Sequence, residues 1–265
     1  MIHLRNDVKA LFAGEKTVSD YFSISGPVLR HSQNRYTLRF ERAGRAFYIK
    51  CHDGIGWREI IKQLVHLRWP QFGAYAEQQA ILKLEQLGIS TMRIAAYGEE
   101  GINPARKRSF IVTDEIGPAV SLEDFCRDWP WHPPDSSIKY QLIKKVAQIM
   151  SELHQNGVNH RDCYLCHFLM NTRESDELHL IDLHRVQIRS RTPQRWIVKD
   201  IGGLYFSAMD IGLNHRDLLR FIRWYTNQPL RMALAQPSRF WRRVQTRARS
   251  LYRSEWNRDP PVRHQ

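Results

Sequence analysis

The chain has 265 residues, of which 42% are hydrophobic and 11% aromatic, so it can bury a sizeable core and is not wholly disordered. Its 40 Lys and Arg residues against 27 acidic residues give a formal net charge of +13, which favours a polyanionic partner such as nucleic acid, anionic lipid or a phosphorylated glycan. No apolar run is long enough to span a membrane, and the first residues, MIHLRNDVKALF, predict no signal peptide. We therefore expect a cytoplasmic protein with four reduced cysteines.

The first part of the chain predicts a β-rich unit with embedded helices. The expected elements are a β meander over 26–52 with a tight turn at 42–45, helices over 55–69 and 74–87, and strands over 93–99 and 109–114. The helix over 55–69 is both apolar on one face and basic. Its apolar residues are Trp57, Ile60, Ile61, Leu64 and Val65, and its basic residues are Arg58, Lys62 and Arg68.

From about residue 117 the pattern becomes mainly helical. Ser121 is expected to cap a helix, a long amphipathic helix covers 138–156, and a short hairpin covers 167–184. Helices resume from about Asp200 to the basic end. A β-rich first part followed by a helical second part predicts an α+β, two-lobed fold with its boundary near Gly117.

Two aspartates in the second part carry the main functional signal. His160-Arg161-Asp162 follows the long helix, and Asp182 comes twenty residues after Asp162, behind an apolar pair. Phosphoryl transfer needs one carboxylate to orient and deprotonate the attacking hydroxyl, and another to hold Mg²⁺ against the phosphates. Taken alone, the first motif is also typical of a turn and the second of a surface acid. In this order and at this spacing, they indicate a kinase.

The first part supplies candidates for holding the nucleotide. Lys50 lies in the predicted strand AFYIKCH, where a kinase places the lysine that binds the α- and β-phosphates of ATP. Glu77, at the start of the next helix, is our candidate for its ion-pair partner, with Glu59 and Glu85 as alternatives. A solvated strand lysine is the other interpretation of Lys50, and the downstream aspartates favour function.

Longer motifs extend this signal over nearly the whole chain. They are FGAYAEQQAI at 72–81, SLEDFCRDW at 121–129, NHRDCYLCHF at 159–168, IDLHR at 181–185 and TPQRWIVKDIGGLYFSAMDIGL at 192–213. The sequence resembles the family of lipopolysaccharide core heptose kinases that phosphorylate the first heptose of the inner core. The resemblance implies one protein-kinase-like domain over 1–265, with an N-lobe over 1–117 and a C-lobe over 118–265. It also implies ATP and Mg²⁺ as cofactors, the heptose 4-OH as acceptor, Asp162 as the catalytic residue and acyl carrier protein as a partner.

The sequence departs from the protein-kinase pattern at several positions. His167 replaces the Asn expected five residues after the catalytic aspartate, and Leu183-His184 replaces the Phe-Gly expected after the metal-binding one. We assign Asp182 and His167 to the metal, since a neutral ring nitrogen is a ligand or hydrogen-bond acceptor. No glycine-rich loop occurs in 26–40, so backbone N–H groups near 32–35 are the substitute.

Two residues are expected to support the catalytic loop rather than to react. Arg161 should position this loop within the active site. Asp200 should cap a helix that begins at Ile201 and brace the same loop.

The cysteines near Asp162 allow other interpretations. Cys163-Tyr-Leu-Cys166-His167 matches the C-x-x-C-H pattern of covalent haem attachment, which belongs to exported proteins. A zinc site of these cysteines with His160 or His154 would lack the second cysteine pair of a structural tetrad. We expect the thiols to pack as small apolar groups beneath the catalytic loop.

Two basic segments, 55–69 and the arginine-rich 238–258, are expected to contact the anionic inner membrane or the acidic glycolipid acceptor. Core packing beneath a solvated charged face is the alternative for both. No nucleic-acid-binding motif accompanies them, so no nucleic-acid partner is expected. We therefore place the protein on the cytoplasmic face of the inner membrane as a peripheral protein.

Two functional alternatives stay open at this point. One is a kinase for another core sugar or for protein tyrosine. The other is a catalytically dead kinase fold that binds anionic lipid or RNA, against which Lys50, Asp162 and Asp182 argue.

Overall fold

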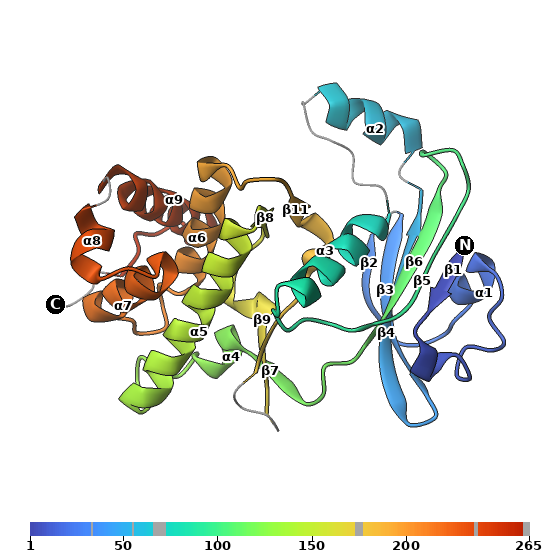
Figure 1. The fold of residues 1–265 in the computed structure, drawn as a ribbon, viewed down its shortest axis with the longest axis horizontal. Coiled ribbons are helices and arrows are strands. Elements are labelled where there is room, and N and C mark those ends of the chain that lie inside the picture. The colour runs from blue at the N-terminus through green and yellow to red at the C-terminus, as the bar shows by residue number, and fades with distance from the viewer. Residues whose placement is uncertain (33, 55, 66–72, 173–176, 236–237, 262–265) are drawn as a thin grey trace. The chain divides into compact units, whose positions relative to one another are not determined.

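The computed structural model describes the chain except residues 33, 55, 66–72, 173–176, 236–237 and 262–265 (Figure 1). The chain divides into two compact units. The N-terminal unit consists of Met1–Glu85, Thr91–Ile116 and Leu183–Arg185, and the C-terminal unit of Gln86–Ser90, Gly117–Asp182 and Val186–Gln265. The first unit contains a large sheet and the second is mainly helical, which confirms the predicted α+β class.

A six-stranded antiparallel sheet forms the N-terminal unit, in the order β1-β5-β6-β4-β3-β2. The strands are β1 (Ile2–Leu4), β2 (Val28–Ser32), β3 (Arg35–Arg42), β4 (Arg45–Asp53), β5 (Ile94–Glu100) and β6 (Arg108–Asp114). Ala43 and Gly44 have φ of +48° and +72°, so both central residues of the predicted 42–45 turn are left-handed, as a tight β-hairpin requires. In this sheet Lys50 pairs with Thr37 of β3 and Ile111 of β6.

The segment before residue 26, for which we predicted no elements, adds strand β1 to the sheet and packs against it. It contains β1, the 3-10 helix η1 (Asn6–Val8) and α1 (Val18–Phe22), which begins with a capping box between Thr17 and Asp20. Tyr21 is fully buried and stacks on Phe110 of β6 with ring centroids 3.9 Å apart. This aromatic contact fixes α1 to the sheet.

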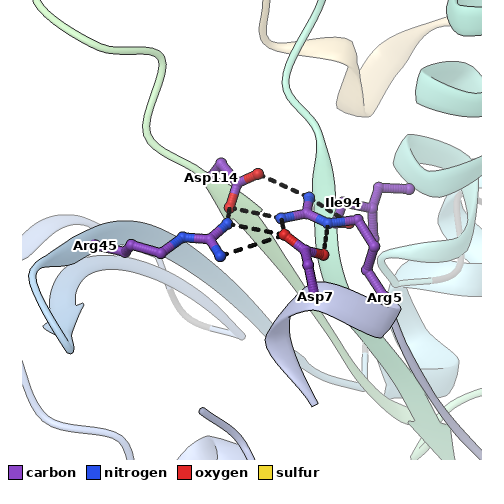
Figure 2. Close-up of polar contacts among 5 residues, drawn as sticks. All are labelled: Arg5, Asp7, Arg45, Ile94 and Asp114. Carbon is purple, nitrogen blue, oxygen red and sulfur yellow. Dashed lines mark hydrogen bonds and ion pairs between the residues drawn. The ribbon is translucent and has the colours of Figure 1, made fainter. Parts of the chain in front are cut away.

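A charged network holds the first residues in place (Figure 2). The Arg5 guanidinium donates to Asp7, to Asp114 at the end of β6 and to the Ile94 carbonyl oxygen, and Arg45 also contacts both aspartates. The hydrogen bond from Arg5 lowers the pKa of Asp7 well below its usual range, with a further contribution from Arg45. The network therefore ties β1 and η1 to the ends of β4, β5 and β6.

The C-terminal unit is built around long helices. Its elements are β7 (Ala119–Ser121), α4 (Leu122–Phe125), α5 (Ser136–Gln155), β8 (Val158–Asn159), η2 (Leu165–His167), β9 (Phe168–Asn171), β10 (Leu178–Leu180), β11 (Gln187–Ile188), α6 (Gln194–Ser207), α7 (His215–Thr226), α8 (Leu230–Ala235) and α9 (Ser238–Trp256). Ser121 caps α4 as predicted, by accepting from the backbone N–H of Asp124. The long helix α5 ends before Gly157, whose φ is +77° and where a Cβ would lie 1.8 Å from the Arg189 carbonyl oxygen. Only glycine fits this turn into β8.

The basic helix α9 buries its apolar side against α6. Val244, Ala248 and Tyr252 are almost completely buried, and Val244 packs in one cluster with Val198 and Ile201 of α6. Core packing, the alternative for the 238–258 segment, is therefore confirmed for these three residues, whereas Trp256 is 55% exposed and the arginines are exposed. None of the described helices is long and apolar enough to cross a membrane.

Candidate functional site

The candidate catalytic loop leaves β8 and is held by a buried carboxylate. Asp200 is 0% exposed, and its two oxygens accept the backbone N–H groups of His160 and Arg161, each at 2.7 Å. Arg161 has a φ of +75°, an uncommon conformation for a non-glycine residue, which these bonds help to maintain. The prediction that Asp200 braces the loop is confirmed. The prediction that it caps a helix is wrong, because α6 begins at Gln194 and Asp200 lies inside it.

His160 connects the catalytic loop to the segment that carries Asp182. Its Nε2 lies 3.0 Å from the Ile181 carbonyl oxygen. Because a carbonyl oxygen can only accept, Nε2 carries the proton and the ring is a donor at this position. Complete burial lowers the pKa of His160, so the ring is neutral at physiological pH. The backbone of Asp182 is therefore fixed from the catalytic-loop side.

His167 lies between the two aspartates that the sequence singled out. Its Nδ1 is 2.7 Å from the Asp162 carbonyl oxygen, and its Nε2 is 3.5 Å from Oδ2 of Asp182. Since Nδ1 must donate to the carbonyl oxygen, the Nε2 of a neutral ring presents a lone pair toward the carboxylate. Asp182 itself has a φ of +60°, an uncommon conformation for a non-glycine residue. The three residues form one cluster in the C-terminal unit.

This cluster fits a divalent cation. A nitrogen lone pair and a carboxylate oxygen that face each other at 3.5 Å are two acceptors, and a cation between them satisfies both. In the described part of the chain, no three His, Cys, Asp or Glu side chains form a complete metal site. Mg²⁺ is commonly held by one or two carboxylates together with substrate phosphates and water, so a nucleotide can supply the remaining ligands.

The nucleotide-binding candidates of the N-terminal unit form the predicted ion pair. The Nζ of Lys50 in β4 lies 2.5 Å from Oε1 of Glu77, in the first turn of α3 (Tyr75–Gln86). The Glu77 side chain is 2% exposed, whereas that of Lys50 is 22% exposed. The carboxylate of the pair is therefore buried, and the lysine is partly accessible to solvent. Of the alternatives, Glu85 is exposed on α3, and the side chain of Glu59 lies outside the described residues.

The proposed substitute for a glycine-rich loop lies at the hairpin between β2 and β3. Ser32 and Arg35 pair with each other at the ends of these strands. Residue 33 lies outside the described residues, so the role of the backbone N–H groups near 32–35 stays a prediction.

A hydrogen-bonded chain behind Asp200 was not predicted. His154 of α5 lies with Nε2 3.4 Å from Asp200 and with Nδ1 2.9 Å from the Tyr225 hydroxyl of α7. The carboxylate can only accept from Nε2, so a neutral His154 accepts at Nδ1 from Tyr225. Burial raises the pKa of Tyr225, which keeps its hydroxyl a donor. The motif around Asp200 pointed to this region, but no local pattern marked the residues from the other helices.

The side chain of Arg161 contacts α6, the helix that contains Asp200. Its guanidinium lies 5.2 Å from the centroid of the Trp196 ring, within the range of a cation–π interaction. This contact and the bond from its backbone to Asp200 support a positioning role for Arg161.

The two cysteines near Asp162 are protonated thiols, of which Cys163 is buried and Cys166 is half-buried. All four cysteines are free. Cys163 is 1% exposed, with its Sγ 3.4 Å from Sδ of Met150, and burial raises its pKa well above the usual value. Cys166 is half-buried, and burial raises its pKa to about 11. The burial of Cys163 and its contact with Met150 support the packing interpretation.

The double substitution Cys163→Ser and Cys166→Ser should keep most of the activity and lower stability. A hydroxyl placed at the apolar Cys163 site costs about 1–3 kcal/mol of unfolding free energy when it finds no partner. Urea unfolding measures this cost, and Cys126→Ser, a buried thiol with a pKa of about 12 elsewhere in the same unit, is the matched control. One zinc or haem per purified chain, lost together with activity in the double variant, would contradict the packing interpretation.

Comparison with known proteins identifies the family of the chain. A model of the lipopolysaccharide kinase (Kdo/WaaP) family matches residues 20–225. The chain is 44% identical over 240 residues to the lipopolysaccharide core heptose(I) kinase WaaP of Escherichia coli strain K12, covering 89% of this chain and 91% of that protein. It is also 44% identical over 254 residues to the WaaP of Pseudomonas aeruginosa strain PAO1, covering 94% and 95%.

A solved structure of WaaP in complex with acyl carrier protein has a similar fold, with a TM-score of 0.82 and 41% identity over 95% of this chain and 99% of that one. The predicted kinase-like fold is thereby confirmed. The chain belongs to the lipopolysaccharide kinase (Kdo/WaaP) family.

Proposed function

We propose that this protein is an ATP-dependent sugar kinase that phosphorylates heptose I of the lipopolysaccharide inner core, at the 4-OH. The observation that carries the proposal is the 44% identity to heptose(I) kinases over most of both chains. The cluster of Asp162, His167 and Asp182 supports it, because these residues meet the needs of phosphoryl transfer.

Each residue of the two candidate sets has a proposed role. Asp162 orients the heptose hydroxyl and accepts its proton. Lys50, held by Glu77, contacts the α- and β-phosphates of ATP, and Asp182 with His167 holds the metal. The Mg²⁺ that accompanies ATP neutralises the charge of the phosphates. Arg161 and Asp200 keep the catalytic loop in its positive-φ conformation.

We also propose three partners: the lipid-linked core acceptor, the anionic cytoplasmic face of the inner membrane, and acyl carrier protein. The net charge of +13 favours each of them, since all are anionic. The solved structure of a relative with acyl carrier protein supports the last one. No nucleic-acid partner is proposed.

Incubation of the purified protein with ATP, Mg²⁺ and unphosphorylated core glycolipid tests this function. We expect one new phosphate, which tandem mass spectrometry locates on heptose I. Parallel reactions with other core sugars and with tyrosine-containing peptides test the competing acceptors. Binding of ATP without transfer to any acceptor would favour the catalytically dead fold instead.

A further inference from the structure

The helix α2 (Gly56–Val65) exposes an apolar stripe. Trp57, Ile61 and Val65 are 55%, 57% and 73% exposed. Residues four apart lie on the same side of a helix, so these three side chains form one continuous line. Ile60 is 4% exposed and anchors the helix to the N-terminal unit from another side. The apolar residues predicted for this helix therefore divide into a buried residue, Ile60, and the three exposed ones. The side chain of Leu64 and residues 66–69 lie outside the described residues.

The surroundings of the stripe are basic and exposed. Arg58 and Lys62 of α2 are exposed next to it. The backbone N–H of Gly56 donates to the Ala105 carbonyl oxygen at 3.0 Å, which places the β5–β6 loop beside the start of α2 (Figure 1). This loop adds Ile102, which is fully exposed, and the exposed Arg106. One end of the N-terminal unit therefore combines exposed apolar side chains with positive charge.

We infer that α2 is an interfacial helix that inserts Trp57, Ile61 and Val65 into an anionic bilayer, with Arg58 and Lys62 at the level of the lipid headgroups. Tryptophan favours the membrane interface, and basic residues beside an apolar stripe are typical of helices that lie on anionic membranes. A second protein chain fits less well as the occupant. A stable interface buries about 800 Å² on each partner, and the surface of three side chains in a line is smaller than that. The inference rests on the proposed function, whose acceptor is presented by a membrane.

The two basic segments then contribute to membrane binding in different ways. Val244, Ala248 and Tyr252 of α9 are buried, and Trp256 at its end is 55% exposed, so the helix contributes mainly the long-range attraction of its exposed arginines. Salt screens such attraction over about 8 Å at physiological ionic strength. The stripe of α2 adds an apolar contribution that salt does not weaken.

Co-sedimentation of the full chain with vesicles of phosphatidylcholine and phosphatidylglycerol, at low and high salt, tests the inference. The variant Trp57→Ser, Ile61→Ser, Val65→Ser should bind the vesicles about tenfold more weakly at high salt, which corresponds to about 1.4 kcal/mol. A matched control replaces three exposed apolar residues of the C-terminal unit, Trp131, Ile138 and Met232, with serine and should bind like the wild type. Equal binding by the α2 variant and the wild type at high salt would overturn the inference.

Further readouts exclude the competing explanations. The α2 variant should keep the melting temperature of the wild type, because its three side chains are exposed, whereas Ile60→Ala should lower it. A wild type that is dimeric without vesicles and becomes monomeric in the α2 variant would overturn the inference in favour of a second copy. With delipidated core oligosaccharide as acceptor, the α2 variant should keep its kcat, and its KM should rise only for acceptor in vesicles. If the wild type phosphorylated neither acceptor, the proposed function would fail, while the binding assay would still decide the role of α2.

Discussion

Replacing Asp162 with asparagine should lower kcat by a factor of about 10²–10⁴, the usual contribution of a positioned general base. Binding of ATP and the melting temperature should change little. The contact of Asp162 with His167 uses its backbone carbonyl oxygen, which the substitution leaves in place. Turnover, the dissociation constant of ATP and thermal unfolding measure the three expectations.

Two further variants distinguish the loss of the catalytic base from the loss of negative charge in general and from a weaker metal site. Asp128→Asn removes an exposed carboxylate of the same unit and should leave kcat unchanged. Asp182→Asn should raise the Mg²⁺ concentration needed for half-maximal activity, because it weakens the cation-binding cluster. If Asp162→Asn kept most of the wild-type kcat, the assignment of the catalytic loop would be wrong.

The strands of the N-terminal unit could be predicted closely because their signals are local. The alternation in β3 and β4 and the turn at 42–45 gave these strands within a few residues of their observed ends. Residues 1–25 carried no such signal. They are ordered by the Arg5 network and by the contact of Tyr21 with Phe110, which join residues far apart in the sequence.

The start of α6 shows how a correct motif led to a wrong boundary. An aspartate before an apolar run is typical of a helix cap, so we predicted a helix from Ile201. In the structure α6 begins at Gln194, directly after Pro193. Asp200 lies in the middle of this helix and accepts a hydrogen bond from the backbone of His160 in the loop. A sequence shows that a carboxylate is present, but not that it is buried beneath a loop forty residues upstream.

The residues of the candidate site could be predicted from the sequence, but the hydrogen bonds that join them could not. The order and spacing of Asp162 and Asp182, together with Lys50 in a strand, were enough to select the residues. The bridge that His167 makes between the two aspartates depends on which ring nitrogen faces which group, and this follows only from the geometry. The functional roles of these residues remain predictions for the variants above.

Replacing Asp200 should destabilise the protein and impair catalysis together. In Asp200→Ala, the backbone N–H groups of His160 and Arg161 lose their acceptor inside the protein, which costs about 1–3 kcal/mol for each donor left unsatisfied. Asp200→Asn keeps the size but offers only one acceptor oxygen, so we expect a loss of about 1–3 kcal/mol. Urea unfolding measures both losses.

The decisive measurement for Asp200 is kcat at a temperature at which the asparagine variant is fully folded. If Asp200 positions the catalytic loop, kcat should fall even there, because Arg161 is no longer held at its positive φ and Asp162 follows it in the chain. The KM for ATP should change less than kcat, since Lys50 and Glu77 belong to the other unit. Tyr225→Phe, which removes only the hydroxyl that contacts His154, should cost about 1 kcal/mol and serves as the mild control. An asparagine variant with reduced stability but the wild-type kcat would show that Asp200 supports folding alone.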